Sequence, residues 1–205
     1  MFTGIVAGVG RILEVERLFV DGGVRLTVDA RHVPAFAADV GDSIAIAGAC
    51  MTAIRVDDGV FAVDTSRESL ERTSGLDAPG EVNIETSVRV GDPLGGHLVA
   101  GHVDGVGEVM SMTQAHESWQ LIVRAPVELS KYFAYKGSVA IDGVSLTVNR
   151  VMDSPQGCEF SVNVIPHTHR VTTLRSLRAG SRVNIEVDLI ARYVERMLSL
   201  RSGNA

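Results

Sequence analysis

Short runs in which apolar residues alternate with polar or small ones recur along the whole chain. One run places Val24, Leu26 and Val28 on one side, and another does the same with Ile44 and Ile46. A period of two residues is typical of strands with one buried face, and turn-forming Asp, Gly and Pro residues separate the runs. The pattern predicts about six short strands in each stretch of roughly 90 residues, which favours an all-β fold of small closed antiparallel barrels over a sandwich or a βαβ sheet.

The chain contains an internal repeat, which sets the expected domain organisation. Ser43–Ala53 aligns with Ser138–Val148, with nearly half of the positions identical and close replacements at several others. Three further pairs of segments follow in the same order: Gly4–Gly10 with Gly101–Gly107, Leu26–Val28 with Leu121–Val123, and Val82–Glu85 with Val183–Glu186. A tandem duplication explains these matches. We expect two homologous units, residues 1–94 and 95–187.

The end of the chain predicts a helix over residues 188–202. Ile190, Val194 and Met197 fall near one face at helical spacing, and Asp188 precedes the run as a natural N-cap. A helix of this length is marginal on its own, so its apolar stripe must pack on something. It either packs on its own barrel or meets the same helix of other subunits.

Composition and charge exclude several classes of function. The net charge is −6 and no basic cluster is visible, which argues against nucleic-acid or anionic-membrane binding. No stretch reaches the length of a membrane span, and Met1–Val6 does not read as a signal peptide, so we expect a cytoplasmic protein. The two cysteines, Cys50 and Cys158, lack a CxxC spacing. They are expected to be free thiols, and no metal site is expected.

Two matched segments, Gly48–Thr52 and Gly143–Thr147, are the first candidates for chemistry. The glycine permits close approach of another backbone or of a flat ring. Cys50 or Ser145 lies two residues before a threonine, so on a strand the two side chains share a face. Neighbouring backbone N–H and C=O groups would then bond the edge of a heterocycle. The alternative is a core strand that carries small residues.

Further candidates lie at the junction of the two units and after the matched strands. His97 and His102 are not spaced for a shared metal, but His102 suits general acid or base chemistry, unless it is simply a structural histidine. The segments 64–70 and 163–168 offer hydroxyl and amide groups for a polyol, or else form a capped turn or helix start. Asp142 and Asp188 are candidate carboxylates, and Lys136 a candidate anion ligand. No phosphate-binding loop or dinucleotide-binding fingerprint is present.

Taken together, these segments resemble riboflavin synthase. The resemblance rests on Met1–Val6, Gly48–Thr52, Gly95–Val103, Tyr135–Ser138, Asp142–Val148, Ile165–Thr168 and Val183–Asp188, and it runs from Met1 to about Leu200. Ala47, Met51 and Ala53 depart from the residues usual in the family. The resemblance implies two six-stranded Greek-key barrels and a C-terminal helix, assembled as a homotrimer. It also implies a dismutation of two 6,7-dimethyl-8-ribityllumazine molecules into riboflavin and 5-amino-6-ribitylamino-2,4-pyrimidinedione, without cofactor or metal. An association with lumazine synthase is possible in such a family.

The resemblance also implies site residues, between the N-terminal barrel of one subunit and the C-terminal barrel of its neighbour. The N-terminal pocket would be lined by Gly4, Ile5, Val6, Cys50, Met51, Thr52, Asp64, Thr65, Ser66, Arg67, Glu68 and Ser69. The C-terminal pocket would be lined by Gly101, His102, Val103, Lys136, Ser145, Leu146, Thr147, Ile165, Pro166, His167, Thr168, His169 and Arg170. The residues expected to affect turnover are Phe2, Ser43, Cys50, His102, Ser145, Thr147 and Asp188, with Asp142 a weaker candidate. For Cys50, ring contact is favoured over covalent attack, because its repeat partner is Ser145.

Two other classes of function remain open at this point. The first is a non-catalytic lumazine- or flavin-binding protein of the same fold, and such relatives tend to keep one pocket and lose the other. Here both glycine–threonine motifs, Phe2 and His102 are present, which favours the enzyme. The second is a flavin-dependent reductase domain, which is disfavoured because no nicotinamide-binding α/β half follows.

Overall fold

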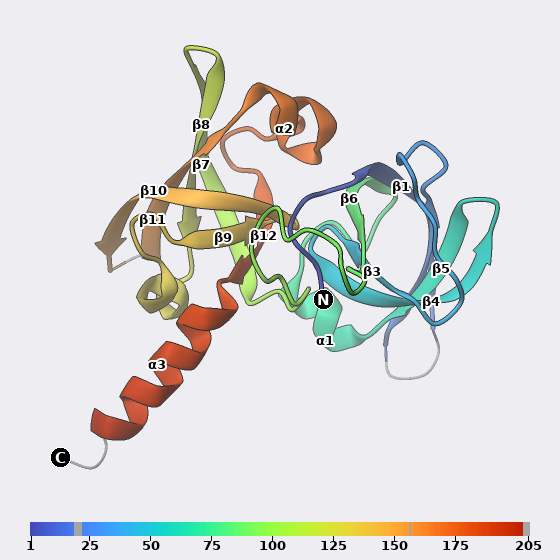
Figure 1. Cartoon of the computed structure of the whole chain (residues 1–205), viewed down its shortest axis with the longest axis horizontal. Helices are drawn as coiled ribbons and strands as arrows, with labels where there is room; N and C mark the ends of the chain where they lie inside the picture. The colour runs from blue at the N-terminus through green and yellow to red at the C-terminus, as the bar shows by residue number, and fades with distance from the viewer. Residues whose placement is uncertain (19–21, 156, 203–205) are drawn as a thin grey trace.

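A computed structural model of the chain describes residues 1–18, 22–155 and 157–202 and contains two closed antiparallel barrels of six strands each (Figure 1). The strands of the first barrel are β1 (Gly8–Arg17), β2 (Val24–Asp29), β3 (Ser43–Ile46), β4 (Ala49–Asp57), β5 (Val60–Thr65) and β6 (Gly80–Thr86). They follow each other around the barrel in the order β1-β2-β5-β4-β3-β6. The all-β prediction is therefore confirmed.

The second barrel repeats the first strand for strand. Its strands are β7 (Gly105–Ala115), β8 (Ser118–Ala125), β9 (Ser138–Ile141), β10 (Val144–Ser154), β11 (Gly157–Val164) and β12 (Arg182–Val187). Their order matches that of the first barrel once each strand is paired with its counterpart. Even the irregularities recur, since the ladder shifts between Ile12 and Glu14 in β1 and between Val109 and Ser111 in β7. The internal repeat is therefore a repeat of backbone structure.

Each barrel encloses its own apolar core. In β2, Val24, Leu26 and Val28 are buried and the residues between them are partly exposed, as the alternation predicts. Phe61 and Phe160 occupy matched places in the two cores and are both fully buried. A third, smaller cluster of buried side chains lies outside both cores, and it consists of Phe2, Ala45, Val99 and Ala140. Two cores that close separately explain why each half of the chain carries a complete strand pattern.

Short helices follow matched strands, and one long helix ends the chain. The short elements are α1 (Arg67–Arg72), η1 (Val127–Tyr132), α2 (Pro166–Val171) and η2 (Thr173–Ser176). The long helix, α3 (Leu189–Ser202), begins where the sequence predicts, because Asp188 Oδ1 accepts a hydrogen bond of 2.9 Å from the N–H of Ile190. Within the described residues, no helix has the length and apolar character needed to span a membrane.

Helix α3 projects away from both barrels (Figure 1). Two ion pairs fasten it to the second barrel, one between Arg192 and Asp104 at 2.8 Å and one between Lys131 and Glu195 at 2.7 Å. Its apolar side chains do not lie against that barrel, since Ile190 is 63% exposed and Met197 is 65% exposed. Of the two arrangements expected for this stripe, packing on its own barrel is therefore wrong.

Two short segments, which we call the straps, run between the barrels. The first strap is residues 1–5 and the second is residues 98–102. They meet in an antiparallel bridge, in which the N–H of Phe2 donates to Val99 O at 2.8 Å and the N–H of Val99 donates to Phe2 O at 3.1 Å. The side chains of both residues belong to the small third cluster, so the bridge is buried.

A buried glutamate holds each strap. Glu85 at the end of β6 accepts hydrogen bonds from the N–H and hydroxyl of Thr3, both at 2.7 Å, and from the N–H of Gly4 at 3.0 Å. Glu186 in β12 is its counterpart. It accepts from the N–H groups of Ala100, Gly101 and His102 at 2.6, 2.9 and 2.9 Å. Burial raises the pKa of both carboxyl groups above its ordinary value, although these donors lower it.

The barrels touch directly where the two glycine motifs meet. A Cβ placed on Gly48 would lie 2.7 Å from the N of Gly143, so only glycines allow this approach. Of the two partners expected for these glycines, the structure therefore shows the backbone. Asn83 and Asn184 bridge the same contact. Asn83 Nδ2 donates to Asp142 O, and Asn184 Nδ2 donates to Ala47 O, both at 2.9 Å.

Replacing Glu186 with glutamine is expected to destabilise the protein. The amide oxygen can still accept from two of the three strap N–H groups, but the NH₂ group faces the third donor. One buried N–H then loses its acceptor, which costs about 1–3 kcal/mol. Glu81→Gln on β6 is the matched control, because exposed Glu81 forms an ion pair with Arg175 at the surface and holds no strap. Urea unfolding measures both variants, and equal stabilities would show that the clamp contributes little.

Candidate functional site

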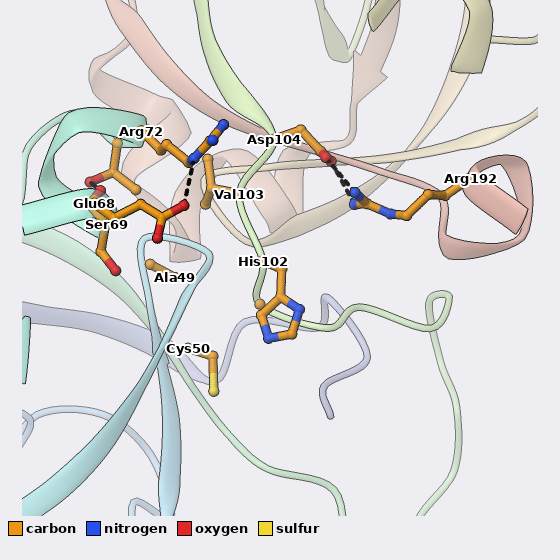
Figure 2. A pocket seen from close by; sticks show the side chains of 11 residues that line it. Ala49, Cys50, Glu68, Ser69, Arg72, His102, Val103, Asp104 and Arg192 are labelled. Atoms are coloured by element: carbon orange, nitrogen blue, oxygen red, sulfur yellow. Dashed lines mark hydrogen bonds and ion pairs between the residues drawn. The ribbon is translucent and has the colours of Figure 1, made fainter. Parts of the chain in front are cut away.

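A pocket of about 450 Å³ opens between the first barrel, the second strap and helix α3 (Figure 2). It is large enough for a small-molecule ligand. The residues that line it are Ala49, Cys50, Glu68, Ser69, Arg72, Thr73, Gly101, His102, Val103, Asp104 and Arg192. We call this pocket the first half-site. It unites a strand end, a helix and a connecting segment that are far apart in the sequence.

Cys50 and His102 both line the first half-site (Figure 2). Along β4, Cys50 is partly exposed and Thr52 exposed, whereas Met51 and Ala53 are buried, so the predicted sharing of one face by Cys50 and Thr52 is confirmed. Among the described residues, Cys50 forms no disulfide. Cys50 is therefore a free, partly exposed thiol in the lining of this pocket.

Two ion pairs stand on opposite sides of this pocket (Figure 2). Arg72 and Glu68, one turn apart on α1, pair at 3.3 Å, and Arg192 pairs with Asp104 at 2.8 Å. Asp104 also accepts from the N–H of Val187 at 2.9 Å, which links the pocket wall to the end of β12. Each arginine thus has a carboxylate partner, so the pocket walls carry balanced charge.

Each strap bonds to a strand of the other barrel, which corrects the assignment of pocket residues expected from the sequence. The N–H of Cys50 donates to Gly101 O at 2.8 Å, and the N–H of Ser145 donates to Gly4 O at 2.8 Å. Gly4, expected beside Cys50, therefore contacts Ser145, and Gly101, expected beside Ser145, contacts Cys50. The cause is the Phe2–Val99 bridge, which turns each strap toward the other barrel. The N–H groups of Cys50 and Ser145 are thus already bonded within the protein.

The place that matches the first half-site in the second barrel is centred on Ser145, and we call it the second half-site. Here the serine is covered by residues that precede the second strap. A Cβ on Gly96 would lie 2.8 Å from Ser145 Cβ, and His97 Nδ1 lies 2.7 Å from Ser145 Oγ. The two half-sites share a backbone frame but differ in access, since Cys50 is open to a pocket and Ser145 is packed from two sides.

Comparison with known proteins agrees with this duplicated architecture. The model of the Lumazine binding domain family matches residues 3–87 and 100–188, one match for each barrel. A riboflavin synthase of Mycobacterium tuberculosis (strain ATCC 25618 / H37Rv) is 43% identical over 202 residues, covering 97% of this chain and 98% of that protein. A riboflavin synthase of Photobacterium phosphoreum is 40% identical over 202 residues, covering 97% of this chain and 89% of that protein. This chain belongs to the riboflavin synthase family of enzymes.

Solved structures show the same fold as this member of the riboflavin synthase family. A crystal structure of LumP complexed with riboflavin superimposes with a TM-score of 0.76 at 24% identity, covering 91% of this chain and 99% of that chain. A crystal structure of LumP complexed with 6,7-dimethyl-8-(1'-D-ribityl) lumazine gives a TM-score of 0.75 at 22% identity. At this identity the likeness concerns the arrangement of the two barrels.

Several residues expected to line the N-terminal pocket of this riboflavin synthase family member have structural partners. Asp64 forms an ion pair with Arg25 at 2.7 Å, and the hydrogen bond lowers the pKa of Asp64. The hydroxyl of buried Thr65 donates to the sulfur of Met51, and Ser66 caps α1 by accepting from the N–H of Ser69 at 3.1 Å. The segment is thus a capped helix start. Of residues 64–69, only Glu68 and Ser69 line the first half-site, while Arg67 pairs with Glu71.

Residues expected in the C-terminal pocket gather on and around α2. His169 stacks on Trp119 with ring centroids 3.8 Å apart, and burial lowers its pKa. Thr168 is partly buried, and its carbonyl accepts from the Thr172 hydroxyl at 2.7 Å. The residues around them with open surface are Ile165, Pro166, His167 and Arg170. Lys136 is exposed and its Nζ donates to Asn149 at 3.0 Å.

The remaining residues expected to affect turnover occupy three different settings. Thr147 is exposed on β10 beside buried Leu146, as Thr52 is beside Met51. Ser43 pairs with Thr52 across β3 and β4. Phe2 is fully buried, with its ring against Gly101, so any effect on turnover must act through the strap.

Ile5, Val6 and His97 complete the account of the site residues. Ile5, the repeat partner of His102, is 54% exposed, and Val6 packs against the second core. Burial lowers the pKa of His97, and Asp188 opposes this effect. The sequence names His97 as a candidate only in relation to a metal. Its place after two glycines does not show that it reaches Ser145.

At the contact between the barrels, the second barrel carries Asp142 where the first barrel carries Ala47. Burial raises the pKa of Asp142 to about 7, although its carboxylate accepts from the N–H of Asn184 at 2.8 Å. The folded protein therefore holds this proton more tightly than the unfolded chain, in which the value is near 3.8. The contribution of Asp142 to stability then falls as the pH rises from about 4 to about 7.

The variant Asp142→Asn is expected to lose this pH dependence, because the amide keeps an acceptor for Asn184 and carries no charge. The wild type loses about 1.4 kcal/mol for each pKa unit of the shift, and less where water reaches the partly exposed residue. Urea unfolding at pH 5 and pH 8 measures the difference. Asp77→Asn, at an exposed position, controls for the loss of one charge. A wild-type slope equal to that of Asp142→Asn would contradict the assignment.

Proposed function

We propose that this chain converts two molecules of 6,7-dimethyl-8-ribityllumazine into riboflavin and 5-amino-6-ribitylamino-2,4-pyrimidinedione. A four-carbon unit passes from one lumazine to the other, and no metal or other cofactor takes part. The observation that carries the proposal is the pair of half-sites, equal in backbone and unequal in side chains, around Cys50 and Ser145. Relatives named riboflavin synthase over nearly the whole chain support it.

The chemistry explains why two related but different half-sites suit the reaction. One lumazine loses a proton from its C7 methyl group, and the other is opened after a nucleophile adds at its C7. Holding the two rings face to face replaces a collision of two molecules by a reaction within one complex, which supplies a large part of the rate. Unequal surroundings give the two identical molecules their separate roles.

We place the complete site between subunits of a cytoplasmic homotrimer. The first half-site of one subunit would face the second half-site of its neighbour, with helix α3 of each subunit in the trimer contact. Ile190, Tyr193 and Met197 are all at least 63% exposed on α3, which supports an apolar contact of this kind. Lumazine synthase is a further candidate partner of the assembly.

In this arrangement the polar side chains of the first half-site contact a lumazine. His102 is placed to exchange a proton with the bound ligand, since it lies exposed at the pocket beside Cys50. Cys50 contacts and orients the ring. We prefer contact to covalent attack because the matched residue of the second half-site is Ser145, which keeps the size but not the reactivity of a thiol.

Incubating the protein with 6,7-dimethyl-8-ribityllumazine is expected to yield riboflavin, measured by its absorbance. Cys50→Ser should retain activity within roughly tenfold of the wild type, because the loss of one contact costs about 1.4 kcal/mol or less. Cys158→Ser is the matched control, since Cys158 is buried in the core of the second barrel. Complete loss of turnover in Cys50→Ser with lumazine binding intact would assign Cys50 as the nucleophile. Tight binding by the wild type without riboflavin formation would instead indicate a non-catalytic lumazine-binding protein.

A charged α3 face is expected to weaken association and activity together. The double variant Ile190→Glu/Met197→Glu places two like charges on the exposed apolar stripe, which opposes its burial between subunits. Arg196→Ala, an exposed substitution on the same helix, is the control. Light scattering gives the mass of the assembly and the riboflavin assay gives the rate. A monomeric double variant with full activity would refute a site shared between subunits.

A further inference from the structure

His97 is buried beside the second half-site and has a defined hydrogen-bonding environment. The residue is only 9% exposed. Its backbone N–H donates to Thr3 O of the first strap at 3.1 Å. The ring nitrogen Nδ1 lies 2.7 Å from Ser145 Oγ, a distance at which one of the two groups donates to the other. The histidine is therefore tied to both a strap and the serine.

The other ring nitrogen of His97, Nε2, indicates which nitrogen of the ring carries the proton. Nε2 of His97 is buried and has no hydrogen-bond partner within the described part of the chain. Asp188 lies close enough to act on His97, but its Oδ1 accepts from Ile190 instead. A buried N–H without an acceptor is rarer than a buried acceptor without a donor. The tautomer that places the proton on Nδ1 therefore fits this environment better.

With the proton on Nδ1, His97 donates to Ser145 Oγ and the serine hydroxyl keeps its own proton. The serine has little freedom to turn away, because Gly4 and Gly96 pack against it. A Cβ on Gly4 would lie 2.6 Å from Ser145 Cβ, and one on Gly96 would lie 2.8 Å from it. The serine nevertheless remains partly exposed. Its hydroxyl is thus held in one orientation with its proton available.

Cys50 in the first half-site has no comparable fixation. The structure gives it a backbone bond to Gly101 and an open pocket, and no side-chain hydrogen bond of its thiol is found among the described residues. The two half-sites therefore differ in more than the exchange of sulfur for oxygen. One presents a free thiol beside His102, and the other a hydroxyl whose direction a buried histidine sets.

We propose that His97 is a positioning residue that donates from Nδ1 to Ser145 Oγ and so presents the Ser145 hydroxyl as a hydrogen-bond donor to the ligand of the second half-site. The matching ligand group is an acceptor, a carbonyl oxygen or ring nitrogen of a lumazine. This inference rests on the proposed function for the identity of the ligand. The hydrogen bond within the protein can be tested without any ligand.

The first test determines the tautomer of His97 in the wild-type protein. Long-range ¹H–¹⁵N spectra of uniformly labelled protein at pH 7.5 distinguish protonated from bare ring nitrogens, and His97→Asn assigns the signals. We expect a neutral ring with its proton on Nδ1, and a changed Nδ1 shift in Ser145→Ala. A proton on Nε2, or no response to Ser145→Ala, would overturn the proposal.

The second test measures whether the two residues act as one unit. His97→Phe and Ser145→Ala should each lower riboflavin formation by roughly tenfold, the equivalent of one lost hydrogen bond of about 1.4 kcal/mol. The double variant should be no worse than Ser145→Ala alone, because His97 acts only through the serine. His97→Asn, whose side-chain NH₂ can replace Nδ1–H, should recover most of the rate. His116→Asn, on an exposed turn, is the matched control.

The outcomes separate this inference from the proposed function. His97 has a merely structural role if the double variant loses activity by the product of the two single losses. The same conclusion follows if His97→Asn is folded but does not recover the rate. If wild-type protein forms no riboflavin at all, the proposed function fails. The spectra still decide in that case whether His97 donates to Ser145.

Discussion

The hydrogen bonds that buried Glu85 and Glu186 accept from the two straps are the interactions on which this structure depends. A carboxylate that leaves water is costly unless donors surround it, and each of these has three within 3.0 Å. The strap backbone is thereby fixed at the end of one barrel. Its carbonyl group is then aimed at the strand of the other barrel that carries Cys50 or Ser145. Barrel contact and half-site geometry thus follow from one pair of clamps.

The features that the sequence predicts well are those with local or periodic causes. Alternation marks the strands because a strand face repeats every second residue, and the cap at Asp188 is visible because it lies next to the helix it starts. The duplication is visible because equal backbones need equal glycines, such as Gly48 and Gly143. The helices α1 and α2 are single turns, too short to show a period.

The features that the sequence does not predict depend on contacts between distant segments. Each strap was expected to serve its own barrel, because sequence copies suggest separate units, but the Phe2–Val99 bridge turns it to the other one. Cys50 and His102 were both expected in the site, yet in different pockets, and the structure brings them into one. His97 lies within a recognised segment, but its link to Ser145 spans a separation of 48 residues and leaves no local signal.

The close approach of the two barrels explains where the two halves can differ. The backbone around Gly48 and Gly143 has no room to change, so the two halves differ there in their side chains. Two of these differences are Cys50 against Ser145 and Ala47 against Asp142. The second barrel carries both the fixed hydroxyl and the partly buried Asp142 carboxyl, whose pKa burial raises to about 7. The two half-sites thus share one backbone frame but offer different groups at its rim, a thiol in a pocket in one and a hydroxyl bonded to His97 in the other.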